Sequence, residues 1–181
     1  ELTIDNAIKQ GANSLLVVPH IDRIHEAVEL AKINHNRNSN EKLQLFSSPS
    51  LYTFKTLEDE EGRDAVKGMQ MAVYWHPGVN IRHYFSNDAR LLWRKDLDYT
   101  IATWRTAMAY DATQAIIKGL KQNPTRKGLQ KVLSDKDNFF FNGATGEVGF
   151  ENGERKQKPA FFVEIKQVEN SETNFDFVPI P

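Results

Sequence analysis

The sequence contains no cysteine, which excludes disulfide bonds, cysteine nucleophiles and cysteine-bound zinc. It carries no excess charge, since 23 basic residues face 24 acidic ones, and this balance does not favour nucleic acid or an anionic membrane as a partner. The longest apolar runs, such as residues 14–19, are far shorter than the roughly 20 residues of a membrane-spanning helix. Residues 1–5 lack the features of a signal peptide, so we expect that any targeting signal was removed or lies upstream.

The residue types that carry catalysis and metal binding form no motif in this chain. There is no Gly-x-Ser-x-Gly sequence to mark a nucleophilic serine. His20 and His25 are five residues apart, which is not the spacing that places two metal ligands on one helix face. Gly143, Gly146 and Gly149 precede a predicted strand and hairpin, whereas a phosphate-binding loop precedes a helix. We therefore expect neither enzyme activity, nor a bound metal, nor a cofactor.

Hydrophobic residues make up 40% of the chain, enough for one core or two small ones. In the first part of the chain their spacing alternates between strand and helix patterns. The predicted elements are a helix over residues 3–10, a strand over 14–18, a helix from Ile21 through Ala31, a strand over 42–46, a helix over 57–66 and a strand over 66–75. Strands separated by helices in this way predict an α/β layered fold with a mostly parallel sheet.

The second part of the chain has a different pattern. Residues 79–97 show little periodicity, and a long helix is predicted over residues 98–122. Its predicted apolar face contains Ile101, Trp104, Met108, Ala112, Ala115, Ile116 and Gly119, with Asp111 elsewhere. Thr125 is the predicted N-cap of a shorter helix that runs through Leu133. The remainder favours strands, with Asn152-Gly153 as a hairpin turn and a strand over 160–165.

Polar loops follow the predicted strands of the first part, at the sheet edge where open α/β sheets bind their ligands. The loop at residues 19–22 begins a helix, whose free N–H groups favour an anion. The loop at residues 47–52 offers three serine hydroxyls, which can both donate and accept hydrogen bonds. The third loop begins with the rigid turn at residues 75–77. The predicted ligand-binding residues are His20, Ile21, Asp22, Ser48, Pro49, Ser50, Tyr52 and Trp75.

Three motifs follow one another in the second part of the chain. Residues 107–112 read Ala-Met-Ala-Tyr-Asp-Ala, residues 141–150 read Phe-Asn-Gly-Ala-Thr-Gly-Glu-Val-Gly-Phe, and Gly153-Glu154-Arg155 precede the last predicted strand. The first is similar to the A-x-x-Y-D-A signature, and the second to the F-x-G-x-T-G-x-V-x-F signature, of the type I periplasmic-binding-protein family. The order of all three resembles this family, also called the receptor-family ligand-binding region. Its best-studied bacterial members bind branched-chain amino acids for ABC importers.

The resemblance implies three-layer α/β/α lobes of a type I periplasmic-binding-protein-like fold, of which this chain is the C-terminal half. Residues 1–78 would be an α/β segment of the second lobe, residues 79–150 would return to the first lobe, and residues 151–181 would close the second lobe. The implied function is to bind a small polar molecule, such as an amino acid, by lobe closure. The implied partner is an ABC importer or a receptor module in the membrane, with the protein in the periplasm or outside the cell.

One departure from the family keeps a second function open. The resemblance implies an acidic side chain in the loop after the second strand, to pair with a ligand ammonium, and Ser47 to Ser50 supply none. Asp22 in the neighbouring loop can compensate for this loss. The alternative is a sensor or regulatory interaction module that has lost the ligand site. Because the implied first-lobe strands are missing, we also expect exposed sheet surface and a homodimer of this fragment.

Overall fold

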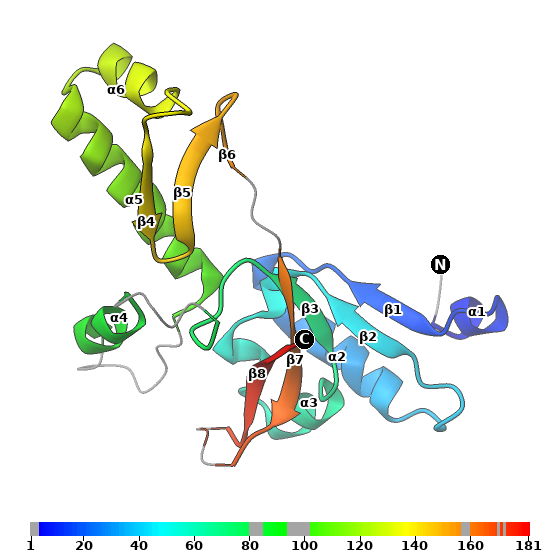
Figure 1. The fold of residues 1–181 in the computed structure, drawn as a ribbon. Helices are drawn as coiled ribbons and strands as arrows, with labels where there is room; N and C mark the ends of the chain where they lie inside the picture. Colours follow the sequence, from blue (N-terminus) through cyan, green and yellow to red (C-terminus); the bar gives the residue numbers. More distant parts are fainter. Residues whose placement is uncertain (1–3, 80–84, 94–101, 157–159, 170, 172) are drawn as a thin grey trace. The chain divides into compact units, whose positions relative to one another are not determined.

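The structure is a computed structural model that describes residues 4–79, 85–93, 102–156, 160–169, 171 and 173–181 (Figure 1). The chain divides into two compact units: residues 1–73 with 161–181 form unit 1, and residues 74–160 form unit 2. The chain therefore enters unit 2 once and returns from it once. Unit 1 holds a five-stranded sheet and unit 2 a three-stranded one.

The sheet of unit 1 has the strand order β1-β2-β3-β7-β8. The first three strands, β1 (Ser14–Val17), β2 (Gln44–Ser47) and β3 (Gln70–Val73), are parallel to one another. They confirm the predicted α/β layering with helices between parallel strands. The last two, β7 (Phe161–Gln167) and β8 (Phe175–Ile180), run antiparallel to their neighbours. The strand β8 lies in the region 151–181, where strands were expected, but its bounds were not predicted.

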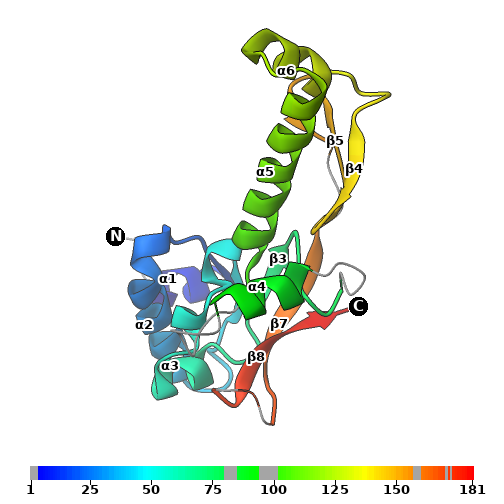
Figure 2. The same ribbon diagram turned by 90° about the vertical axis from the view of Figure 1, so that its left-hand side faces the viewer.

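The helices of unit 1 are α1 (Ile4–Lys9), α2 (Ile24–His35) and α3 (Glu60–Ala65), with short 3-10 turns η1 (Ile21–Arg23), η2 (Pro49–Leu51) and η3 (Phe54–Thr56). The helix α2 buries Ile24, Val28 and Ala31, as its periodicity predicts, whereas Ile21 lies in η1 and is exposed. Asp59 caps α3, because its carboxylate accepts a hydrogen bond from the Gly62 N–H at 2.7 Å. Both α2 and α3 lie on one side of the sheet (Figures 1 and 2).

The other face of this sheet carries exposed apolar side chains. Leu16 on β1 is 64% exposed and Phe162 on β7 is 48% exposed. A shallow groove of about 480 Å³ runs over this face and is lined by Ser14, Leu16, Phe46, Ser47, Gln70, Met71, Ala72 and Phe162. Exposed sheet surface of this kind was expected from the sequence. Its coverage by a second copy of the chain stays a prediction.

Unit 2 contains α4 (Phe85–Trp93), α5 (Trp104–Gln122), α6 (Arg126–Leu133), β4 (Phe140–Gly143), β5 (Gly146–Glu151) and β6 (Glu154–Arg155). The helix α5 lies along the β4–β5 hairpin (Figure 2). Thr125 caps α6 as predicted, since its hydroxyl accepts a hydrogen bond from the Gly128 N–H at 3.0 Å. Asn152 and Gly153 both have positive φ, 54° and 83°, which is the conformation that a two-residue hairpin turn requires.

The structure corrects the predicted face of α5. The buried residues are Ala107, Asp111, Ala115 and Gly119, which recur at every fourth position. Asp111 is therefore on the buried face, while Ala112 and Ile116, predicted to be on it, are exposed. The prediction is confirmed for Ala115 and Gly119. It was wrong for Asp111, Ala112 and Ile116 because it followed apolarity alone, whereas hydrogen-bond donors outside the helix hold the Asp111 carboxylate. Ile101 lies outside the described residues.

Over the part of the chain that the structure describes, no helix is long and apolar enough to cross a membrane.

Candidate functional site

The loops after β1 and β2 begin side by side at one edge of the sheet of unit 1. Val17 and Ser47 are partners in the parallel register, and the Ser48 N–H donates to the Val17 carbonyl at 3.1 Å. Parallel strands end at the same edge, so the polar residues of both loops start from neighbouring backbone positions. This places the two predicted loops next to each other, and the argument for a site begins here.

The first loop presents an imidazole and a carboxylate, in contact with each other, to solvent. The His20 ring Nδ1 contacts the Asp22 carboxylate, and these side chains are 79% and 70% exposed. The hydrogen bond from His20 lowers the pKa of Asp22 below its usual value. Ile21, between them, is 44% exposed. The loop therefore offers a carboxylate, an imidazole and an apolar side chain to a molecule that approaches from solvent.

The second loop is shaped by its own serines. The Ser48 hydroxyl accepts a hydrogen bond from the Ser50 N–H at 3.4 Å, and Pro49 occupies the first position of η2. The Ser47 hydroxyl donates to the Ser48 carbonyl at 2.9 Å. Ser48, Pro49 and Ser50 are half-buried. The loop is thus a compact turn that keeps uncharged polar groups at the same sheet edge.

The two aromatic residues that were predicted to bind the ligand, Tyr52 and Trp75, are both buried. Tyr52 is 1% exposed and meets the Phe177 ring edge-on, with centroids 4.6 Å apart. This burial raises the pKa of the Tyr52 hydroxyl above its usual value. Trp75 belongs to unit 2 and is also 1% exposed; its indole N–H donates to the Ala144 carbonyl at 3.0 Å. In this structure neither ring faces solvent, and contact of either ring with a ligand stays a prediction.

Metal ligands do not gather in the described parts of the chain. No group of three or more His, Asp or Glu side chains among those residues is placed to hold a metal ion. His76, on the third predicted loop, is buried and its Nδ1 accepts a hydrogen bond from the Gly78 N–H at 2.9 Å. That bond makes His76 part of a local turn.

Sequence reasoning missed a buried polar cluster in unit 2. The Asp111 carboxylate accepts hydrogen bonds from the backbone N–H groups of Ala144, at 2.6 Å, and Thr145, at 3.0 Å. It also accepts the Thr145 hydroxyl, which in turn accepts a hydrogen bond from Arg155. All four residues fall in or beside the three motifs that carry the family resemblance. The available signal was an acidic residue four positions from Ala107 and from Ala115 on a buried helix face.

Comparison with solved structures shows that this chain has the type I periplasmic-binding-protein fold. The leucine binding protein LivK of Thermotoga maritima matches with a TM-score of 0.73 and 14% identity, over 96% of this chain and 46% of that one. A solute-binding protein of an ABC transporter from Rhodopseudomonas palustris, in complex with 3,4-dihydroxybenzoic acid, matches with a TM-score of 0.71 and 8% identity, over 98% and 46%. A putative branched-chain amino acid ABC transporter from Rhodospirillum rubrum matches with a TM-score of 0.67 and 21% identity, over 98% and 47%.

These matches confirm the predicted fold class. The chain spans about half the length of these structural relatives. That the matched part is the C-terminal half, and that units 1 and 2 are parts of the second and first lobes, stay predictions. Comparisons with protein-family models and with curated protein sequences return no significant match.

Proposed function

We propose that this chain is part of an exported solute-binding protein, which holds a small polar molecule by closure of two lobes and presents the closed form to an ABC importer or a receptor. One observation carries this proposal: two polar loops lie side by side at the carboxyl edge of parallel strands, joined by the hydrogen bond from the Ser48 N–H to the Val17 carbonyl. The fold supports it, because the matched proteins are solute-binding proteins and receptors.

The chemistry of the loops favours a small molecule with both an acidic and a basic group, such as an amino acid. The exposed Asp22 carboxylate can accept hydrogen bonds from a ligand ammonium. Asp22 would in this way take the role of the acidic residue that is missing from the loop at residues 47–50. The His20 ring and the hydroxyls of Ser48 and Ser50 can donate to a ligand carboxylate. One structural relative is a leucine binding protein and another is in complex with 3,4-dihydroxybenzoic acid, and both of these small molecules carry a carboxylate.

Isothermal titration calorimetry on the full-length protein tests the proposal with a panel of amino acids and hydroxybenzoates. We expect at least one panel member to bind. The Asp22→Asn variant should lower the affinity for amino acids at least tenfold and leave the affinity for benzoates unchanged, since a charge-assisted hydrogen bond contributes about 1.5–3 kcal/mol. Asp64→Asn is the matched control, because Asp64 is an exposed acid on α3 of the same unit. Equal affinity of the wild type and Asp22→Asn for every ligand contradicts the assigned site.

A second function is favoured by one observation, the burial of Tyr52 and Trp75. If no ring is available to enclose a ligand, the chain is better suited to a sensor or regulatory interaction module that kept the fold and lost the site. Absence of binding heat for the whole panel, from a protein that unfolds cooperatively, supports this alternative and contradicts solute binding.

A further inference from the structure

The turn between β4 and β5 in unit 2 is held by one buried carboxylate. Ala144 and Thr145 form this turn and are 0% and 6% exposed, while Asp111 on α5 is 1% exposed. Both Asp111 oxygens accept hydrogen bonds from this turn, through two backbone N–H groups and the Thr145 hydroxyl. A buried carboxylate is costly unless donors surround it, so its presence here indicates a fixed arrangement of all three residues.

The approach of the hairpin to α5 depends on Gly143. A methyl group at this position would lie 2.3 Å from Asp111 Oδ1 and 2.9 Å from the Val148 side chain. Both distances are shorter than any van der Waals contact, so a side chain here would force the hairpin away from the carboxylate. The glycine of the F-x-G-x-T-G motif and the aspartate of the A-x-x-Y-D-A motif therefore belong to one contact.

The segment by which the chain enters unit 2 is fixed to the same turn. Unit 2 begins at Tyr74, and the next residue, Trp75, donates its indole N–H to the Ala144 carbonyl at 3.0 Å. The Trp75 ring meets Phe85 edge-on, with centroids 5.7 Å apart, and packs in a cluster that also includes Ala107 of α5. The entering chain is thus attached to the residue whose own N–H is held by Asp111.

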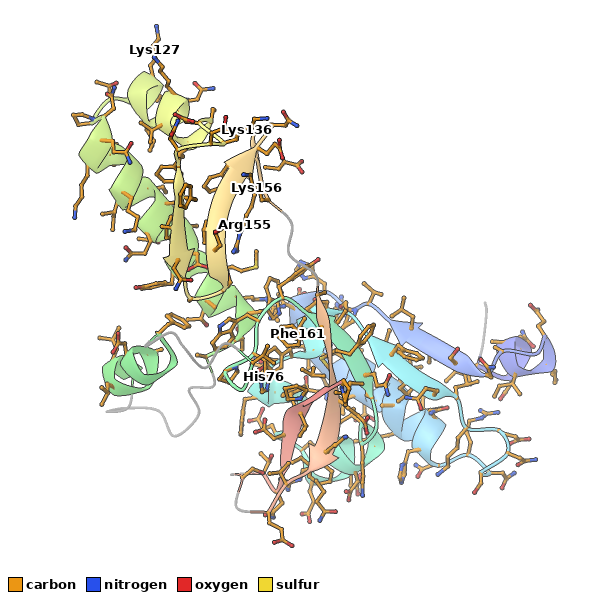
Figure 3. All side chains as sticks on the ribbon, in the orientation of Figure 1. His76, Lys127, Lys136, Arg155, Lys156 and Phe161 are labelled. Atoms are coloured by element: carbon orange, nitrogen blue, oxygen red, sulfur yellow. The ribbon has the colours of Figure 1, made fainter. Side chains whose placement is uncertain are left out.

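The strand β6, the last of unit 2, is fixed to the neighbouring residue, Thr145. Unit 2 ends at Ala160, and Arg155 on β6 donates from Nη2 to the Thr145 hydroxyl at 2.5 Å. The same nitrogen lies 3.9 Å from the Asp111 carboxylate. Arg155 lies alongside β5 (Figure 3). Arg155, on the last strand of unit 2, is thus attached to the second residue that Asp111 holds.

We propose that Asp111 is a positioning residue that joins both chain connections of unit 2 into one rigid assembly. Through Ala144 it fixes the entering segment at Trp75, and through Thr145 it fixes the leaving segment at Arg155. The two connections then keep a constant spacing and orientation where they meet unit 2. The consequence for lobe closure rests on the proposed function. When the lobes turn about the two connections, Trp75 and Arg155 move together as parts of one rigid assembly.

Hydrogen–deuterium exchange on the ligand-free protein tests this inference. The amides to follow are hydrogen-bonded ones on either side of unit 2: Val79 donates to the His76 carbonyl after the entering segment, and Lys156 donates to the Gly149 carbonyl next to β6. We expect Asp111→Asn to raise exchange at both positions together by about tenfold, since it turns one acceptor into a donor that faces donors. Exchange in α6 should stay unchanged. Asp137→Asn, at an exposed acid of the same unit, is the matched control.

Two further variants test separately the contact through Ala144 to Trp75 and the contact through Thr145 to Arg155. They also test the inference if Asp111→Asn fails to fold. Thr145→Val removes the hydroxyl that Arg155 contacts, so exchange should rise at Lys156 and stay constant at Val79. Trp75→Phe removes the indole N–H, so exchange should rise at Val79 and stay constant at Lys156. A uniform rise across unit 2 in the Asp111 variant, or unchanged exchange at both amides in all variants, overturns the inference. Because no ligand is added, either result leaves the calorimetric test of solute binding unaffected.

Discussion

Replacing Asn34 with alanine should destabilise unit 1 strongly, although asparagine is a polar residue near the end of a helix. Asn34 lies in the last turn of α2 and is 5% exposed. Its side-chain amide donates to the Leu43 carbonyl at 2.9 Å, and its oxygen accepts from the Leu43 N–H, also at 2.9 Å. Both backbone polar groups of Leu43, just before β2, are therefore satisfied by one side chain.

The expected cost follows from these two hydrogen bonds. The alanine side chain leaves both backbone polar groups of Leu43 without their partner. Each such buried group costs about 1–3 kcal/mol, so Asn34→Ala should lower the free energy of unfolding by about 2–6 kcal/mol. The midpoint of thermal unfolding should fall by about 2–4 °C for each kcal/mol in a chain of this length. Urea unfolding followed by far-ultraviolet circular dichroism measures the change, and its denaturant dependence should stay that of the wild type.

Two comparison variants make this prediction specific. Asn36→Ala alters an exposed asparagine two residues further on and should change the unfolding free energy by less than about 0.5 kcal/mol. Asn34→Asp should lose stability as the pH rises through the carboxyl range, because a carboxylate can accept from Leu43 but repels its carbonyl, which raises the pKa of the new group in the folded state. A loss below about 1 kcal/mol for Asn34→Ala would refute the assigned contacts.

Three further predictions use other contacts. Thr125→Ala should cost about 1 kcal/mol in urea unfolding and Thr125→Ser much less, because a hydroxyl at this position caps α6. Burial raises the pKa of the Tyr52 hydroxyl, so the contribution of Tyr52 to stability is present below pH 10, its usual pKa being about 10, and is lost as the pH rises further. Tyr52→Phe should remove this loss of stability at alkaline pH, and an unchanged loss in the variant contradicts the assignment. The hydrogen bond from Lys32 lowers the pKa of Asp59, so this contribution is present above about pH 4 and lost as the pH falls. The stability difference between wild type and Asp59→Asn should therefore shrink in acid, and a constant difference contradicts this reasoning.

For the candidate site, the sequence placed the polar loops but not the orientation of their aromatic residues. The positions of His20 and Ser48 after two successive strands were enough to predict that their loops meet at one sheet edge, because parallel strands end together. The burial of Tyr52 and Trp75 could not be predicted in the same way. It depends on Phe177 and Ala144, which come from strands and turns much later in the chain.

The sequence by itself determined the local elements: the apolar spacing of α2, the Thr125 cap and the turn at Asn152 and Gly153 each depend on residues within a few positions of one another. The tertiary structure decided where buried polar groups find their partners. The sequence pattern predicts that Asp111 is on the surface of its helix, yet its carboxylate accepts hydrogen bonds from N–H groups 33 and 34 positions away. A polar side chain is buried when distant donors offset its loss of water, and the folded chain alone brings those donors to it.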